Sequence, residues 1–447
     1  MRLKSLILGA ACALALTTPA AAQSLTAITG GRVLTGTSVI ENGTVVIQNG
    51  RVVSVGSGAA PSGARIIDAR GKTVTPGLVA VDAVLGLNEV GSVPGTGDSS
   101  NNANSISASF DVSYGLDPWS MGLPVARLGG ITRAVVTPSH SGGGDGHAHQ
   151  DDSDFAGVGE GGLQSPGLFA GQAAVIDLGE GGEILVQPRV AMVAPFGEAG
   201  AGIAGGARGA QFVQFKETLA EVRLYARNKA AYDRAAMRDL SLSRADLEAL
   251  IPVVEGRMPL IVTARRAADI RQVLRLAREE NLKIILDSAE EGWLVADEIA
   301  AAQVPVLLDV LSNLPSNFEM RAARMQNAAA LNAAGVVIAI KGSDGGGRVR
   351  EMRYNAGNAV SHGLPYAAAI QAITTNPARI FGMDGRFGEL RTGAAADVVV
   401  WSGDPLEPLT IAEAVFIDGQ EQPMTSRQFL LRDRYARPTT MPRAYAQ

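Results

Sequence analysis

The chain has very few of the side chains that carry metal and thiol chemistry. Its 447 residues include one cysteine and four histidines, and aromatic residues make up only 5%. An excess of positive charge is also missing, because 39 basic residues face 44 acidic ones and the formal net charge is −5. This balance argues against a general binder of nucleic acid or of an anionic membrane surface.

The N-terminal segment predicts export. Arg2 and Lys4 precede an apolar run from Leu6 to Leu16, and Ala20-Ala21-Ala22 offers a cleavage site before Gln23. This is the pattern of a secretory signal peptide over residues 1–22, with a retained anchor as the alternative. The apolar run is too short to span a bilayer, and no later run is long enough either.

Cleavage after Ala22 would change the mature chain in two ways. The only cysteine, Cys12, would be removed, which excludes disulfides and Cys-ligated zinc. Loss of Arg2 and Lys4 would take the formal charge from −5 to −7. The predicted location is a bacterial periplasm or the exterior of the cell.

Glycine is present in excess. The 53 glycines exceed the average share of about 7%, so glycine-bearing loops are expected. Hydrophobic residues make up 46% and charged residues 19%, which is ordinary for a globular protein with a sizeable core. At roughly 100–200 residues per domain, the length predicts two or three domains, or one large barrel with an accessory domain.

Both ends of the mature chain are rich in short β-strands. Near the N-terminus, "TVVIQNGRVVSVG" contains Asn49-Gly50, the strongest short hairpin signal. Near the other end, "ADVVVWSG" has the composition of a strand, and Asp418-Gly419 marks a second hairpin. Two β-rich ends around a different middle predict one small β-sandwich domain built from both termini, with residues 23–76 as its first part and 386–447 as its second.

The middle, residues 77–385, alternates strands and helices. Four apolar runs are each followed by a stretch of helical character: Leu260–Ala264, Lys283–Asp287, Val304–Val310 and Val336–Ile340. Consecutive βα units with apolar strands imply a parallel sheet that is covered on both faces. Their spacing of about 20–30 residues favours a (β/α)8 TIM-like barrel, an α/β fold, with a doubly wound sheet as the alternative.

The front half of this region is less regular. Strands are predicted at Leu78–Leu85, Ile131–Thr137 and Ile184–Val193, with a glycine-rich insertion near 141–210. Within it, His147 and His149 form an H-x-H pair beside acidic residues, which could hold a divalent ion. The alternative is a solvated acidic loop.

Two segments at the predicted domain junctions carry a family resemblance. "GKTVTPGLVAVDAVLGL" and "AAIQAITTNPARIFGMDGRFGELRTGAAADVVVWSGDPLE" resemble the metal-dependent amidohydrolase superfamily, in particular its imidazolonepropionase-like and dihydroorotase-like hydrolases. The resemblance implies hydrolysis of C–N bonds at a mononuclear or binuclear metal centre. Its usual ligands are an H-x-H pair on the first barrel strand, Lys or Glu on the fourth, His on the fifth and sixth, and Asp on the eighth.

The chain departs from this ligand set at most positions. Alignment on Pro76-Gly77-Leu78 puts Asp82 and Val84 where the H-x-H pair belongs, and Lys216 or Glu217 could stand for the fourth-strand ligand. On the fifth and sixth strands, hydroxyl side chains replace histidine, at Thr263 and Ser288. A zinc-type metal therefore remains only as an alternative, and the prediction is a degenerate metal site with no cofactor.

The remaining side chains predict a candidate site at the barrel mouth. By resemblance, Asp344 after strand eight and Asp82 are the candidate catalytic carboxylates, with Asp344 in the place of the family's metal-bound base. Arg265, Thr263 and Ser288 are candidate substrate-binding residues, and Arg265 is the expected ion-pair partner of Asp344.

Two functional hypotheses follow. The first is an exported hydrolase of C–N bonds in small molecules or small peptides, with reduced or altered activity. The second is a pseudoenzyme that binds a small ligand or a partner protein through the same mouth. Neither predicts nucleic acid or a membrane span, and a homo-oligomer is an open alternative because members of this superfamily commonly associate.

Overall fold

The structure is a computed structural model that describes residues 25–90, 93, 95–101, 106–139, 167–343 and 348–436. The predicted signal peptide, the pair His147 and His149, and Asp344 all lie outside the described residues. In the described part of the chain, no helix combines the length and the apolar character needed to cross a membrane.

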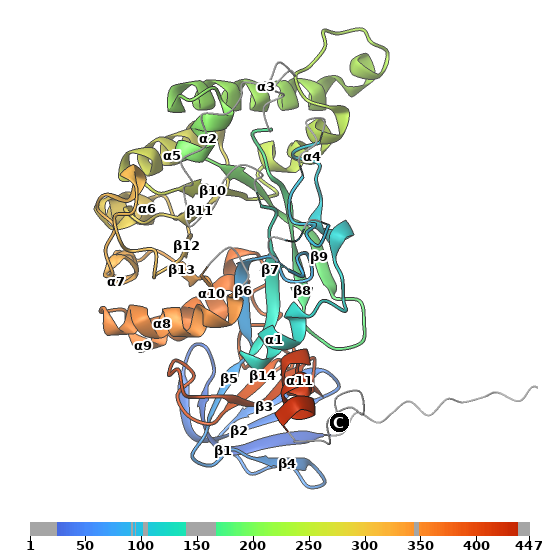
Figure 1. The fold of residues 1–447 in the computed structure, drawn as a ribbon, viewed down its shortest axis with the longest axis vertical. Coiled ribbons are helices and arrows are strands. Elements are labelled where there is room, and N and C mark those ends of the chain that lie inside the picture. The colour runs from blue at the N-terminus through green and yellow to red at the C-terminus, as the bar shows by residue number, and fades with distance from the viewer. Residues whose placement is uncertain are drawn as a thin grey trace, which may run out of the picture.

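Strands from both ends of the chain form one eight-stranded sheet, as predicted for a domain assembled from both termini (Figure 1). The order is β16-β15-β14-β5-β1-β2-β3, and β4 pairs with β1. The bounds are β1 Thr26–Leu34, β2 Val39–Gln48, β3 Arg51–Gly56, β4 Arg65–Asp68, β5 Thr73–Pro76, β14 Val398–Trp401, β15 Ala412–Ile417 and β16 Gln420–Glu421.

Both predicted hairpins are confirmed. Asn49-Gly50 joins β2 to β3 with φ values of 51° and 74°, and Asp418-Gly419 joins β15 to β16 with 47° and 75°. Two successive positive φ values define the type I′ turn, whose twist matches that of the flanking strands. A core from both termini fills the domain, including Ile28, Val45, Val52, Val398, Val400 and Phe416.

A second eight-stranded sheet forms the nearly closed barrel, in the order β13-β12-β11-β10-β9-β8-β7-β6. Its strands are β6 Leu78–Ala83, β7 Ile131–Val136, β8 Gly171–Asp177, β9 Leu185–Pro195, β10 Leu260–Ala264, β11 Ile284–Ser288, β12 Val306–Leu308 and β13 Ile338–Ile340. The barrel prediction is confirmed. One strand differs from a regular (β/α)8 barrel: β8 runs antiparallel to both neighbours.

Helices cover the outside of the barrel (Figure 1). They are α1 Gly122–Leu128, α2 Gly197–Ile203, α3 Arg208–Asp233, α4 Arg244–Val254, α5 Ala267–Glu280, α6 Ala296–Ala301, α7 Asn327–Ala333, α8 Met352–Ser361, α9 Tyr366–Ala372 and α10 Thr375–Ile380. A further helix, α11 (Arg427–Ala436), lies beside the first sheet, which is built from both ends of the chain. In α5, Ile270, Val273 and Leu276 repeat every three residues and are buried, which is the pattern of an amphipathic helix.

The first and last strands of the barrel sheet are joined through a segment that is not a strand. The amide N–H of Val79 in β6 donates to the carbonyl of Ile373 over 3.0 Å. The Asn376 side-chain Nδ2 donates to the carbonyl of Ile338 in β13 over 2.8 Å. Ile373 directly precedes the T-x-N-P-A segment of the sequence and Asn376 belongs to it, so this stretch of chain bridges the seam between β6 and β13.

Gly130 provides a test of the contact between the two sheets. Its φ is +79°, and a Cβ there would lie 2.3 Å from the ring of Trp401, which is fully buried in β14. Overpacking and a left-handed backbone together predict that Gly130→Ala lowers the free energy of unfolding by about 2–4 kcal/mol in chemical denaturation. Gly71 is the control, since it has a φ of +75° but no atom within 4 Å of a Cβ. Equal losses in the two variants would contradict the packing argument.

Candidate functional site

Polar side chains gather where the barrel strands end. Asp82 lies near the end of β6, Thr263 near the end of β10, and Asp287 and Ser288 close β11, while Lys341 directly follows β13. These strands are parallel, so their carboxyl ends meet at one mouth of the barrel, where barrel enzymes place their active sites.

Lys341 lies at the centre of this group. Its Nζ donates to Asp82 Oδ2 over 2.7 Å and to Asp287 Oδ1 over 2.6 Å. The Lys341 side chain is almost completely buried, whereas the Asp82 side chain is 32% exposed. One ammonium therefore holds together two carboxylates from the first and sixth strands of the sheet.

The outer oxygens of both carboxylates also have partners. Thr137 Oγ1 donates to Asp82 Oδ1 over 2.8 Å, and Ser288 Oγ donates to Asp287 Oδ2 over 3.0 Å. Thr263 Oγ1 reaches the same Asp287 oxygen over 3.4 Å. Because each carboxylate is held at both oxygens, its orientation toward Lys341 is fixed.

The backbone around the site is strained at two positions. Asp82 has a φ of +53° and interrupts the register of β6 with β7, and Ser288 has a φ of +76°. A left-handed conformation costs a non-glycine residue about 1–2 kcal/mol. Such strain persists where the surrounding contacts over-determine it, which is common at functional sites.

The charges of the group support one another. Burial alone would raise the pKa of Asp82, but the ammonium of Lys341 and the hydrogen bonds from Lys341 and Thr137 lower it below its ordinary value. Burial opposes the charged form of Lys341, yet Asp287 and Asp82 raise its pKa above the usual range. The Lys341 ammonium therefore lies between two carboxylates, and the three side chains carry one formal negative charge in excess.

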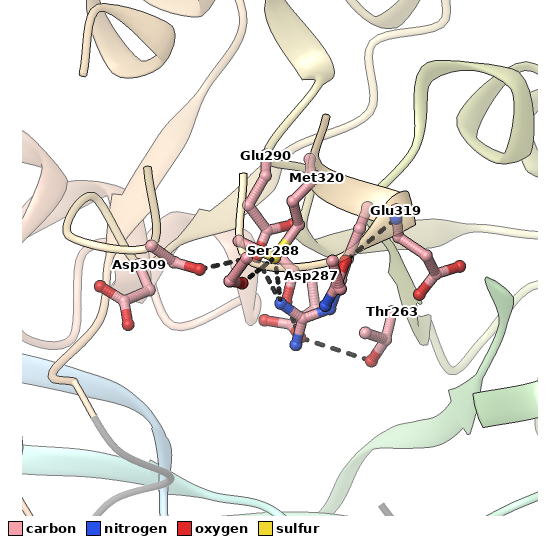
Figure 2. Close-up of polar contacts among 12 residues, drawn as sticks. Thr263, Asp287, Ser288, Glu290, Asp309, Glu319 and Met320 are labelled. Atoms are coloured by element: carbon pink, nitrogen blue, oxygen red, sulfur yellow. Dashed lines mark hydrogen bonds and ion pairs between the residues drawn. The ribbon is translucent and has the colours of Figure 1, made fainter. Parts of the chain in front are cut away.

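A second ion pair lies beside this group. Arg265 donates to Glu290 Oε1 over 2.7 Å, and Ser312 donates to the same oxygen over 3.2 Å. Figure 2 shows Glu290 in the same cluster as Met320, Ser288 and Asp287, with Thr263 at the edge of that cluster. The Glu290 side chain is only 3% exposed, and its Oε2 has no partner among the described residues. Burial raises the pKa of Glu290, and the charge of Arg265 only partly offsets this.

The structure brings together most of the predicted site residues that it describes. Asp82 accepts a hydrogen bond from Lys341. Thr263 and Ser288 both donate to Asp287, which also accepts from Lys341. Arg265 lies at the same mouth, but its carboxylate partner is Glu290, and the cation that Asp82 contacts is Lys341. The expected pair of Arg265 with Asp344 falls outside the described residues.

The suggestion of a fourth-strand ligand at Lys216 or Glu217 is wrong. Both residues lie in helix α3, and Lys216 pairs with Glu279 on the outside of the barrel. Lys341, Asp287 and Glu290 were not among the site residues predicted from the sequence. A signal for the first two was present, since Lys341 follows the apolar run "VVIAI" and Asp287 ends "KIILD". A charge inside or at the end of a buried strand needs a partner.

The described residues do not form the metal centre that the resemblance implies. No group of three or more His, Cys, Asp or Glu side chains in the described ranges is placed to hold a metal ion. Between the two carboxylates of the mouth lies an ammonium, which already supplies a positive charge. Hydroxyl groups at Thr263 and Ser288 are poor substitutes for imidazole toward zinc.

Part of the chain that contains this mouth matches a known protein family. Residues 262–423, which run from β10 to just beyond β16, match the Amidohydrolase family. Residues 262–423 of this chain form an amidohydrolase family domain. The resemblance to the amidohydrolase superfamily is thereby confirmed, and the matched range contains Thr263, Asp287 and Lys341.

Two individual proteins extend the comparison. The amidohydrolase from Thermotoga maritima MSB8 has a similar structure, with a TM-score of 0.75, 23% sequence identity, and coverage of 89% of this chain and 99% of its own. At that identity the likeness concerns the fold. "Amidohydrolase tasK" of Hapsidospora irregularis is 46% identical over 61 residues, which are 14% of this chain and 6% of that protein. The amidohydrolase domain supports a general assignment to the hydrolases.

Proposed function

We propose that this protein is an exported hydrolase of C–N bonds in amides, cyclic amides or small peptides, with a degenerate metal site and low activity. The amidohydrolase family domain supports the reaction class. The observation that carries the proposal is the Lys341 group, a cation flanked by two carboxylates at the mouth of a barrel of this type. The proposed partners are small molecules or small peptides, with no nucleic acid, and a homo-oligomer is an open alternative.

The chemistry of the group is compatible with slow hydrolysis. A Lys ammonium has three N–H donors, and Asp82 and Asp287 accept from Lys341. A remaining N–H can stabilise negative charge that develops on a carbonyl oxygen. Asp82 is the more accessible carboxylate and would accept a proton from water. Since its pKa is lowered, it is a weak base, so we propose a low rate.

The same contacts favour a second candidate, a pseudoenzyme that binds a small ligand or a partner protein without turnover. Both oxygens of Asp82 already accept hydrogen bonds, and Lys341 is engaged by two carboxylates. A closed network of this kind stabilises the mouth and leaves no free base. The half-exposed Arg265 would then provide the contact to an anionic group of a ligand.

The activity of Asp82→Asn distinguishes the candidates. General base catalysis contributes typically 10²–10⁴-fold, so we expect turnover of amides, cyclic amides and dipeptides by the purified mature chain to fall by about 100-fold or more. The exposed Asp68→Asn variant is the control and should keep full activity. Saturable binding without turnover in the unmodified chain would support the second candidate. Unchanged turnover in a folded Asp82→Asn variant would contradict the role of Asp82.

A further inference from the structure

We infer that Arg265 recognises the carboxylate of a ligand through an open side of its guanidinium, and that Glu290 is the positioning residue that holds this guanidinium in place. On this inference the mouth selects amides that carry a free carboxylate, such as N-acyl amino acids and dipeptides, over neutral amides. The inference rests on the proposed function, because it names the ligand class of the same site, but it concerns binding and can be measured without turnover.

Only one nitrogen of the Arg265 guanidinium is used inside the described part of the chain. Nη1 donates to Glu290 Oε1 over 2.7 Å, and the Met320 sulfur lies 3.6 Å from the same nitrogen. Nε and Nη2, which form the forked side of the group, have no acceptor among the residues that the structure describes. The side chain is 31% exposed, and neither nitrogen is a buried unpaired atom. The forked side is therefore open to solvent at the mouth.

Other arginines in the protein use this forked side for an internal partner. Arg133 binds Asp397 through Nε and Nη2, over 2.7 and 3.0 Å. Arg208 likewise donates to two acidic side chains through these nitrogens, over 3.0 and 2.6 Å. Arg265 differs from both, because its bond to Glu290 leaves the fork unused. The pair is thus an ion pair with one side left for a further anion.

The open guanidinium is held in one orientation by two consecutive glutamates. Glu290 is 3% exposed, and its Oε1 also accepts from Ser312 over 3.2 Å. The amide N–H of Glu291 donates to the carbonyl of Arg265 over 3.0 Å, and the Glu291 side chain accepts from the amide of Ala322. Both the side chain and the backbone of Arg265 are therefore fixed before a ligand arrives, so little conformational entropy is lost on binding.

The open side of the guanidinium discriminates between anionic and neutral groups. Its two parallel N–H bonds match the two oxygens of a carboxylate, whereas a carboxamide offers one oxygen and sets an NH2 group against the second donor. The charge of the mouth narrows the choice of anion. Asp82 and Asp287 together exceed Lys341 by one negative charge, which repels a doubly charged phosphate more than a singly charged carboxylate.

The test compares by calorimetry the binding of N-acetyl-L-alanine and N-acetyl-L-alaninamide, which differ only in carboxylate against carboxamide. We expect the purified mature chain to bind the acid at least about tenfold more tightly than the amide. Arg265→Met should make the two affinities equal. Arg265→Lys keeps a cation for Glu290 but has no fork, so it should lose most of the preference even if Arg265→Met does not fold. Arg271→Met, which opens an exposed pair with Glu298, is the matched control and should keep the preference.

Two variants of Glu290 test its positioning role. Glu290→Ala should lose the preference although Arg265 is still present, and Glu290→Gln should restore it, because its amide oxygen can still accept from Nη1. A merely structural role would lower the melting temperature of Glu290→Ala without changing the ratio of the two affinities, and that result would overturn the role of Glu290.

The remaining outcomes separate this inference from the proposed hydrolase activity. Equal binding of the acid and the amide by the unmodified chain, no measurable binding of the acid, or a preference that survives in folded Arg265→Met and Arg265→Lys would overturn the inference. Turnover of neutral amides without any preference would overturn it while leaving the hydrolase proposal intact. A preference for the acid without turnover would support the inference together with the second candidate function.

Discussion

Replacing Arg133 by methionine should lower the free energy of unfolding by about 3–5 kcal/mol, since it leaves a deeply buried carboxylate without its cation. Arg133 lies in β7 of the barrel and makes two bonds to Asp397, of 2.7 and 3.0 Å, while Asp397 is 1% exposed. It also reaches Asp418 over 2.8 Å. Burial opposes the guanidinium charge, but Asp397 and Asp418 raise the pKa of Arg133 above its usual range.

The measurement is chemical denaturation at pH 7, and an exposed pair in the same protein is the control. Arg70 and Asp68 also form a bidentate pair, but on the surface, so Arg70→Met should leave the denaturation midpoint unchanged. Because Asp397 directly precedes β14 and Asp418 lies in the turn between β15 and β16, the Arg133 effect reports how firmly the sheet built from both chain ends is joined to the barrel. A midpoint for Arg133→Met equal to that of Arg70→Met would contradict this account.

The second large effect is expected at the mouth. Lys341→Met keeps most of the side-chain volume and removes the charge, so at pH 7 it should cost about 2–4 kcal/mol of stability. The lower limit reflects the partial solvent access of Asp82. Two neighbouring carboxylates would then face each other without the ammonium that holds them together.

The dependence on pH has a definite sign. In the unmodified protein the folded-state pKa of Asp82 is lowered, so its contribution to stability is present above the unfolded value near 4 and is lost as the pH falls through the folded value. Without the ammonium, burial raises that pKa instead, and the variant loses stability as the pH rises above about 4. The difference between the two proteins should therefore shrink from pH 7 to pH 4 in urea denaturation. A constant difference would contradict the electrostatic assignment.

The sequence predicted the turns and strands whose conformation depends mainly on residues that are close together in the chain. The Asn49-Gly50 and Asp418-Gly419 turns need two residues that tolerate positive φ, and the structure has them there. Strand β10 has the predicted bounds, Leu260–Ala264, because a short apolar run leaves little choice of ends. Strand β8 was missed because "GQAAVID" is made largely of small residues and is buried on both faces, so it shows no alternation.

The candidate site was predicted in part for a related reason. Asp82, Thr263 and Ser288 could be placed at one mouth because the resemblance aligns them with the family's ligand positions near the ends of barrel strands. Which cation meets which carboxylate depends on contacts across the barrel, such as that between Lys341 and Asp82, which are 259 positions apart. The periodic pattern of hydrophobic residues in the sequence does not indicate a contact between residues so far apart. The choice of Glu290 for Arg265 likewise depends on how two neighbouring loops turn after β10 and β11.

The seam between β6 and β13 has a consequence for how the protein behaves among other chains. A sheet that does not close by strand pairing has two edges, and exposed edges can add a strand from another molecule and begin aggregation. Here Ile373 accepts from the first strand, and Asn376 donates to the last. The stretch from Ile373 to Asn376 therefore contacts both edges at once, and Pro377, which follows it, cannot donate a hydrogen bond to an incoming strand. The barrel gains protection against edge-to-edge association without the geometry of complete closure.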